Sequence, residues 1–317
     1  MNVQNRKPRV AILSRSFGTA SHAPFKVLES AGIPYTIVHN QEPQNTEHIA
    51  EIVGDADAVI CGSDVMDRYV FDRCPNLKII SKHGVGLDSI DQKLAEERGI
   101  FVCCTPSANF ETVADFAMTL ILALQRDLRS NIIMTKTPSW NKPALTHDLF
   151  RATVGIMGYG RIGRAVAERL CGFQARILVY DPYLDASKIS TPNTKLVSMD
   201  EVLSQSDIIS LHLPLTDSTK NIMNRDAFAK MKRGASIVNT SRGAIMDYRA
   251  LYDALRSGKL RSAAVDVYPQ EPPVNEPLLE LPNVIATPHI ATYTVESNDR
   301  MGIAAAKNIV DFFGSQI

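Results

Sequence analysis

The sequence has no excess of charge of either sign. Its 317 residues include 34 Lys plus Arg and 34 Asp plus Glu, so the formal net charge at pH 7 is zero. A neutral chain gives no electrostatic reason to expect nucleic acid or an anionic membrane surface as a partner. Charge blocks and low-complexity tracts are also missing, which indicates an ordered globular protein.

Long apolar runs and paired cysteines are missing as well. The longest apolar stretch, residues 116–124, is about half of a membrane span, and the apolar segment 10–13 is too short for a secretory signal. The five cysteines contain no CxxC pair, which favours free thiols in a reducing compartment over a disulfide framework or a metal site. We therefore expect a cytoplasmic protein with no membrane partner and no metal.

Short β-branched segments alternate with helical periods from end to end. One set of strands is expected at residues 9–13, 35–38, 58–61 and 78–81, and a second set at 153–157, 176–180, 208–211, 236–239 and 262–267. This alternation predicts parallel sheets with crossover helices. The fold class is therefore α/β, with two separately wound units.

A strong amphipathic helix lies between the two sets. Its apolar positions run from Val113 to Leu124 with helical spacing. The following segment, 130–149, has no clear period and contains the single tryptophan, Trp140. Such a long irregular segment is either packed as a loop or used as an arm between subunits.

A GxGxxG motif follows the strand expected at 153–157. Gly158 suits the tight turn, Gly160 allows close approach of a pyrophosphate, and Gly163 allows helix and strand to pack. Asp181 ends the next strand about 20 residues on, where a carboxylate binds the ribose hydroxyls. No arginine follows Asp181 to receive a 2′-phosphate, so the motif predicts NAD rather than NADP.

Three further polar residues follow later strands of the second set. Arg242, Glu271 and His289 are expected at the carboxyl edge of this sheet, beside the nicotinamide. Arg242 suits a planar carboxylate, and His289 suits proton transfer to a carbonyl oxygen. A glutamate beside the imidazole favours its protonated form and fixes its orientation. The set indicates hydride transfer to a 2-oxo acid.

With these motifs in this order, the sequence resembles the D-isomer-specific 2-hydroxyacid dehydrogenase family, which includes 3-phosphoglycerate dehydrogenase and glyoxylate/hydroxypyruvate reductase. The resemblance rests on GYGRIGR at 158–164, VYDP at 179–182, HLPLTDSTKNI at 212–222, NTSRG at 239–243, AVDVY with QEP within 264–272, and TPHI at 287–290.

The resemblance implies roles for individual residues. Arg242 would bind the substrate carboxylate, His289 would be the acid/base, and Glu271 would tune His289. Asp266 would hold the nicotinamide carboxamide. The implied NAD contacts are Gly158, Gly160, Arg161, Ile162, Gly163, Asp181, His212, Leu213, Pro214, Thr240, Ser241, Arg242, Asp266 and His289. The implied substrate contacts are Lys82, His83, Gly84, Val85, Gly86 and Arg242.

The resemblance also implies an architecture of two doubly wound parallel-sheet domains. A Rossmann cofactor domain, residues 104–287, would be inserted in a flavodoxin-like substrate domain formed by residues 1–103 and 288–317. The active site would lie in the cleft between the domains. The protein would be a homodimer through the region 109–149.

Some positions depart from the family pattern and leave the substrate open. Residues 61–64 carry no arginine to hold a distal phosphate, which disfavours 3-phosphoglycerate, and Ile290-Ala291 replaces a usual glycine at the second position after His289. Arg15 or Lys82 is an alternative reader of a second anionic or polar group. Two other functions stay open: an NADH-sensing protein similar to the transcriptional co-repressors, and formate or phosphite oxidation, which Glu271 disfavours.

Overall fold

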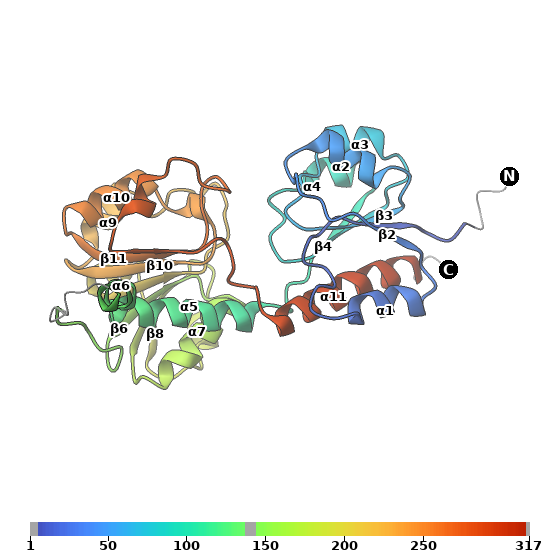
Figure 1. Ribbon diagram of the computed structural model, residues 1–317. Helices are drawn as coiled ribbons and strands as arrows, with labels where there is room; N and C mark the ends of the chain where they lie inside the picture. The colour runs from blue at the N-terminus through green and yellow to red at the C-terminus, as the bar shows by residue number, and fades with distance from the viewer. Residues whose placement is uncertain (1–5, 137–143, 315–317) are drawn as a thin grey trace. The chain divides into compact units, whose positions relative to one another are not determined.

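The computed structural model describes residues 6–136 and 144–314. The chain divides into two compact units, of which the first comprises residues 1–109 and 292–317 and the second residues 110–291. Each unit is a parallel β-sheet covered by helices (Figure 1). Both transitions between the units lie a few residues later in the chain than the expected boundaries after 103 and 287.

Local hydrogen bonds explain where the first transition falls. The Thr105 amide and hydroxyl both donate to the Gly84 carbonyl, and Arg300 Nε donates to the Ala108 carbonyl. These contacts attach residues 104–109 to the first unit. The second unit therefore begins only where the long helix begins, at Phe110.

The second transition is set by a buried carboxylate. Asp266 accepts hydrogen bonds from the backbone amides of Ile290 and Ala291, which attaches this segment to the second unit. His289 is therefore carried by the same unit as the GxGxxG motif.

The sheet of the first unit has the strand order β2-β1-β3-β4-β5, with every pairing parallel. This is the flavodoxin-like order. The strands are β1 (Val10–Ile12), β2 (Tyr35–Ile37), β3 (Ala58–Cys61), β4 (Ile79–Lys82) and β5 (Phe101–Cys103). The helices are α1 (Ala23–Ser30) and α11 (Val295–Gly314) on one face, and α2 (Thr46–Val53), α3 (Arg68–Arg73) and α4 (Gln92–Glu97) on the other.

The sheet of the second unit has the order β12-β11-β10-β9-β6-β7-β8, again parallel throughout. This is the Rossmann order with one added strand. The strands are β6 (Thr153–Met157), β7 (Arg176–Tyr180), β8 (Thr194–Leu196), β9 (Ile208–Leu211), β10 (Ala235–Asn239), β11 (Leu260–Val265) and β12 (Val284–Ala286).

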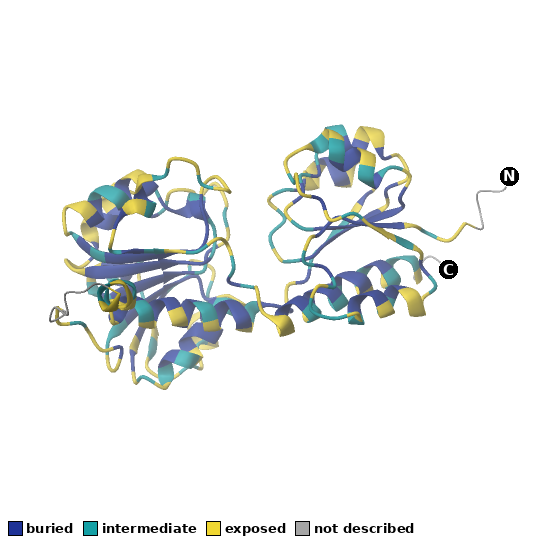
Figure 2. Cartoon of the chain, viewed as in Figure 1, coloured by how far each residue is buried: buried dark blue, intermediate teal, exposed yellow. Residues whose placement is uncertain are grey.

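Helices cover both faces of this sheet. The helices α5 (Phe110–Gln125) and α7 (Arg161–Cys171) pack on one face, and α8 (Met199–Gln205), α9 (Arg225–Lys230) and α10 (Tyr248–Arg256) on the other. The helix α6 (Leu128–Thr135) follows α5 and buries none of its residues. The central strands are buried on both faces (Figure 2), and because of this their sequences are continuous apolar runs.

Three strands, β5, β8 and β12, escaped the sequence analysis. Each has only three residues and forms an edge of its sheet, and Val284 in β12 is the one buried residue among them. Three residues are too few to show a strand period or an apolar run as long as those of the central strands. As for membrane insertion, no helix within the described ranges combines the length and apolar character that a bilayer span requires.

Candidate active site

The glycine motif forms the turn between β6 and α7. Gly158 donates its amide to the Tyr180 carbonyl. Its φ of +94° is a backbone conformation that glycine adopts without steric strain. A Cβ on Gly163 would lie 2.1 Å from the Gly158 carbonyl oxygen, which shows how closely helix and turn pack. Gly160 is the N-cap of α7 and precedes Arg161 and Ile162 in the first turn.

The space over this helix N-terminus fits a pyrophosphate. A Cβ built on Gly160 would meet no atom within 4 Å, so the backbone is open to a ligand at this point. The first-turn amides of α7 have no carbonyl partner inside the helix, and the helix dipole is positive there. Backbone donors and open space together form an anion site.

The groups expected around the rest of the cofactor lie at the same sheet edge. Asp181 follows β7 and accepts the amides of Tyr159 and Tyr183 at 2.9 and 3.0 Å, which fixes its carboxylate. Among the described residues, Thr240 Oγ1 and His212 Nδ1 are buried without a hydrogen-bond partner. Burial lowers the pKa of His212 to about 4, so this imidazole is neutral at neutral pH. Unpartnered polar atoms at this edge of the sheet fit a polar cofactor.

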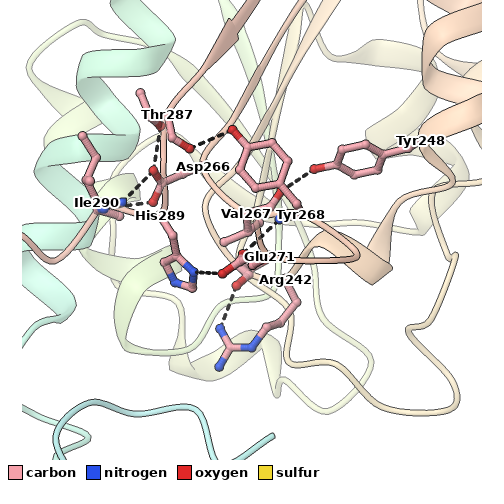
Figure 3. Close-up of polar contacts among 11 residues, drawn as sticks. Arg242, Tyr248, Asp266, Val267, Tyr268, Glu271, Thr287, His289 and Ile290 are labelled. Atoms are coloured by element: carbon pink, nitrogen blue, oxygen red, sulfur yellow. Dashed lines mark hydrogen bonds and ion pairs between the residues drawn. The ribbon is translucent and has the colours of Figure 1, made fainter. Parts of the chain in front are cut away.

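Arg242, Glu271 and His289 follow three neighbouring strands. β10, β11 and β12 lie side by side in the sheet, and each of these residues comes from the segment after one of them. Parallel strands end at one edge, so the three segments meet there, as Figure 3 shows. The expected catalytic set is therefore assembled within the second unit.

His289 and Glu271 form a direct pair. His289 Nδ1 lies 2.7 Å from Glu271 Oε2, and Glu271 Oε1 accepts the backbone amide of Tyr268 at 3.1 Å. Burial raises the pKa of Glu271, but the hydrogen bond and charge of His289, the Tyr268 amide and the charge of Arg242 outweigh it, so the net pKa is lowered. Glu271 is therefore a carboxylate at neutral pH. Both side chains stay about half exposed, so the imidazole is accessible.

The Arg242 side chain is held by its own turn. Its Nη1 donates to the Ser241 carbonyl at 2.7 Å. The buried Asn239 at the end of β10 accepts the Ser241 amide and hydroxyl and donates Nδ2 to the Arg242 carbonyl. The guanidinium is a fixed positive charge whose field reaches Glu271.

The loop that carries His289 is fixed by Asp266, which is fully buried. Its carboxylate accepts the Thr287 hydroxyl at 2.6 Å, besides the two backbone amides described above. His289 itself has φ +55°, a left-handed conformation that is uncommon for a side chain of this size and is typical of functional sites. Asp266 thus holds this loop in place, whereas its expected contact with a carboxamide stays a prediction.

The expected substrate loop follows β4 in the first unit. Within the described residues, the backbone amides of Val85 and Gly86 have no acceptor, and Val85 is exposed. Gly84 has φ +142°, a conformation that glycine alone adopts freely. Burial lowers the pKa of His83 to about 4, with a smaller effect in the same direction from Lys82, so His83 is neutral. The loop therefore offers free backbone donors, as an anion site does.

Lys82, by contrast, serves the first unit internally. Its side chain is buried, and its Nζ donates to the Gly62 carbonyl and to the Ser89 hydroxyl. The ammonium group therefore already has two hydrogen-bond acceptors within the first unit.

Residues 118–291 match the model of the NAD binding domain of the D-isomer specific 2-hydroxyacid dehydrogenases, more than half of the chain. The chain belongs to the D-isomer specific 2-hydroxyacid dehydrogenase family. As a member of this family it is an NAD-dependent oxidoreductase that acts on the CH–OH group.

Individual relatives of this family extend over both units. The chain is 40% identical to a hydroxypyruvate reductase of Thermotoga maritima over 277 residues, 84% of this chain and 88% of that protein. It is 38% identical to a D-3-phosphoglycerate dehydrogenase of Mycobacterium leprae, covering 84% of this chain but 51% of the relative. The chain thus spans about half the length of that relative.

A solved family structure matches the whole architecture. An NAD-dependent formate dehydrogenase from Staphylococcus aureus in complex with NAD has a TM-score of 0.85 and 31% identity, covering 98% of this chain and 96% of that one. The family fold of two parallel-sheet α/β domains is therefore confirmed.

Sequence reasoning missed some residues of the candidate site. Asn239, Tyr268 and Thr287 lie within the motifs that carry the resemblance, yet no role was predicted for them. The available signal was position: Asp266 and Tyr268 are two residues apart at the end of a strand, so both can point toward one neighbouring segment.

Proposed function

We propose that this protein transfers a hydride reversibly between NAD(H) and a D-2-hydroxy acid/2-oxo acid pair. The observation that carries the proposal is the 2.7 Å contact of His289 Nδ1 with Glu271 Oε2, with the guanidinium charge of Arg242 acting on the same carboxylate. When bound, the nicotinamide supplies the hydride. The remaining tasks are to bind a carboxylate and to move one proton, and the three side chains suit them.

The roles follow from the geometry of each group. With Nδ1 bonded to Glu271, His289 presents Nε2 for proton transfer to the carbonyl oxygen of the substrate. The Glu271 carboxylate stabilises the positive charge that the imidazole carries before it donates. Arg242 binds the substrate carboxylate through parallel hydrogen bonds, and its fixed turn limits the geometries that are open to it.

A kinetic panel tests this function. NADH oxidation is measured with glyoxylate, hydroxypyruvate, pyruvate, branched and aromatic 2-oxo acids, and 3-phosphohydroxypyruvate. Ketoacid reduction requires protonated His289 and hydroxyacid oxidation requires the neutral form, so the two directions should lose activity at opposite ends of the pH range. Parallel pH limbs, or near-full activity of His289→Ala, would contradict the assigned role. NADH binding without turnover of any acid would favour the NADH-sensing alternative.

We assign recognition of a second polar or anionic group on the substrate to Arg15 rather than to Lys82. Arg15 is exposed and lines a polar pocket of about 70 Å³ at the ends of β1 and β3, together with Ser16, Asn40 and Asp64. Lys82 is committed internally, as described above. The substrate panel should therefore change its rank order in Arg15→Gln, and an unchanged order would refute the assignment.

We also propose that the protein is a homodimer through the region 109–149. The helix α6 buries none of its residues, and Leu145 is 98% exposed. Exposed apolar side chains gather in and near this region: Leu122, Leu128, Ile132, Ile133, Leu145 and Phe150. Such a patch is typical of an interface. Residues 137–143, with Trp140, lie outside the described residues.

Light scattering after gel filtration tests the dimer. The double variant Ile133→Asp/Leu145→Asp should be monomeric, and an unchanged mass would contradict this interface.

A cytoplasmic location is part of the same proposal, because all five cysteines are free thiols, as in proteins of reducing compartments.

A further inference from the structure

The three catalytic segments share one neighbour. Tyr268 lies just after β11 and is 9% exposed. Its backbone amide donates to Glu271 Oε1 at 3.1 Å, and its hydroxyl donates to the Thr287 carbonyl at 2.8 Å. Figure 3 shows the side chain reaching from the Glu271 turn to the segment that precedes His289.

The contact with Thr287 acts on His289 at short range. The Thr287 carbonyl also accepts the backbone amide of His289 at 3.0 Å, so one oxygen carries both bonds. This bond closes a three-residue turn that includes the left-handed His289. The Tyr268 hydroxyl therefore anchors the turn on which the imidazole depends for its direction.

The contact with Glu271 selects which carboxylate oxygen faces the imidazole. With Oε1 bonded to the Tyr268 amide, Oε2 is the atom left for His289 Nδ1. Both partners of the acid–base pair are thus tied to Tyr268. Its backbone amide holds Glu271, and its side chain holds the His289 turn. A loosened ring would change the geometry of both.

The third segment contacts the backbone of Tyr268. A Cβ on Gly243, the residue after Arg242, would lie 2.0 Å from the Tyr268 carbonyl carbon and 2.4 Å from Pro269 N. The Arg242 turn therefore packs directly against this residue. Burial, with smaller effects from Asp266 and Glu271, raises the pKa of Tyr268 to about 12, so its hydroxyl remains a donor at working pH.

We propose that Tyr268 is a positioning residue that holds Arg242, Glu271 and His289 in one geometry, a role that rests on the proposed hydride transfer. It touches no reacting atom and acts through the segments that it holds.

Tyr268→Phe isolates the side-chain part of this role, because it keeps the ring and removes the hydroxyl alone. The chain offers a matched control in Tyr248→Phe. Tyr248 is similarly buried and its ring lies near that of Tyr268, but its hydroxyl donates to the Val267 carbonyl, in the segment that leads to Glu271, and leaves the His289 turn untouched. Each variant therefore loses one tyrosine hydrogen bond to a backbone carbonyl in the same region.

Both variants are assayed with NADH and hydroxypyruvate or glyoxylate, in water and in deuterium oxide. We expect kcat of Tyr268→Phe to fall about 3- to 10-fold, the equivalent of one hydrogen bond, with KM for NADH unchanged and a larger solvent isotope effect. A larger isotope effect means that proton transfer has slowed, which a general loss of stability does not produce. Tyr248→Phe keeps the hydrogen bond to Thr287, so its kcat and solvent isotope effect should change less than those of Tyr268→Phe.

Amide hydrogen exchange of residues 287–291 tests the positioning without turnover. Exchange of this segment should be faster in Tyr268→Phe and unchanged in Tyr248→Phe. Equal kcat, isotope effect and exchange in the two variants would overturn the proposal. If the unaltered protein reduces no 2-oxo acid, the proposed function fails, while the exchange data still decide whether Tyr268 holds the His289 turn.

Discussion

The two later glycines of the GxGxxG motif should respond in opposite ways to an added methyl group. At Gly160 a Cβ meets nothing within 4 Å, and φ −73° with ψ −159° is allowed for alanine. At Gly163 a Cβ lies 2.1 Å from the Gly158 carbonyl oxygen, which is backbone and cannot move away cheaply. Gly160→Ala should therefore disturb the ligand, and Gly163→Ala the fold.

The magnitudes follow from these environments. In Gly160→Ala the helix N-cap becomes slightly less favourable, while the unfolded chain loses a similar amount of conformational entropy. The free energy of unfolding should therefore change by less than about 1 kcal/mol. Its methyl group occupies the space for a pyrophosphate, and loss of one hydrogen bond to a charged group is about 1.5–3 kcal/mol, or about 10- to 100-fold in affinity. Gly163→Ala should destabilise by about 3 kcal/mol through overpacking, which lowers Tm by about 6–12 °C.

Thermal unfolding and NADH fluorescence titration measure the two effects. Gly172→Ala is the matched control at the other end of α7, where φ is −60° and the nearest contact of a Cβ is 3.5 Å. It should change neither NADH affinity nor, appreciably, stability. Unchanged NADH affinity in Gly160→Ala would refute the assignment of this turn to the cofactor.

Three further outcomes are expected. Asp266→Asn should destabilise the protein by about 2–4 kcal/mol in denaturant titration and lower kcat, because an amide cannot replace both acceptor oxygens of the buried carboxylate; wild-type stability and kcat would contradict this. Glu271 has a lowered pKa, so its contribution to stability is present above its ordinary value of 4.5 and is lost as pH falls through the lower folded value. Glu271→Gln should therefore lower the free energy of unfolding in urea by less than about 1 kcal/mol above pH 4.5, a small effect because the side chain is partly exposed to solvent. This loss of stability should disappear in acid, and a loss that persists there would show that it does not come from the charge of Glu271. Burial raises the pKa of Cys61 to about 12, so iodoacetamide at pH 8 should modify Cys61 only after unfolding, as read by peptide mass spectrometry, and rapid labelling of the folded protein would refute its burial.

The sequence by itself determined the α/β class, the dinucleotide turn and the three candidate catalytic residues. These depend on local patterns: apolar runs in strands buried on both faces, glycines at a fixed spacing, and polar residues directly after strands. The same reasoning placed five of the seven strands in the second unit at or near their observed bounds. It missed β8 and also β12, the strand that presents His289, because each is an edge strand of only three residues.

Tertiary structure alone decided how these residues are held. Asp266 meets Ile290 and Tyr268 meets Thr287 only because β11 and β12 are neighbours in the sheet, and this pairing also assigns His289 to the second unit. Lys82 and Arg15 look alike in the sequence, since both are cations at strand ends. Lys82 is buried and donates to the Gly62 carbonyl, which follows the neighbouring strand β3, whereas Arg15 lines a pocket. Contacts between segments distant in sequence set burial, and burial decides which polar groups remain free to meet a ligand.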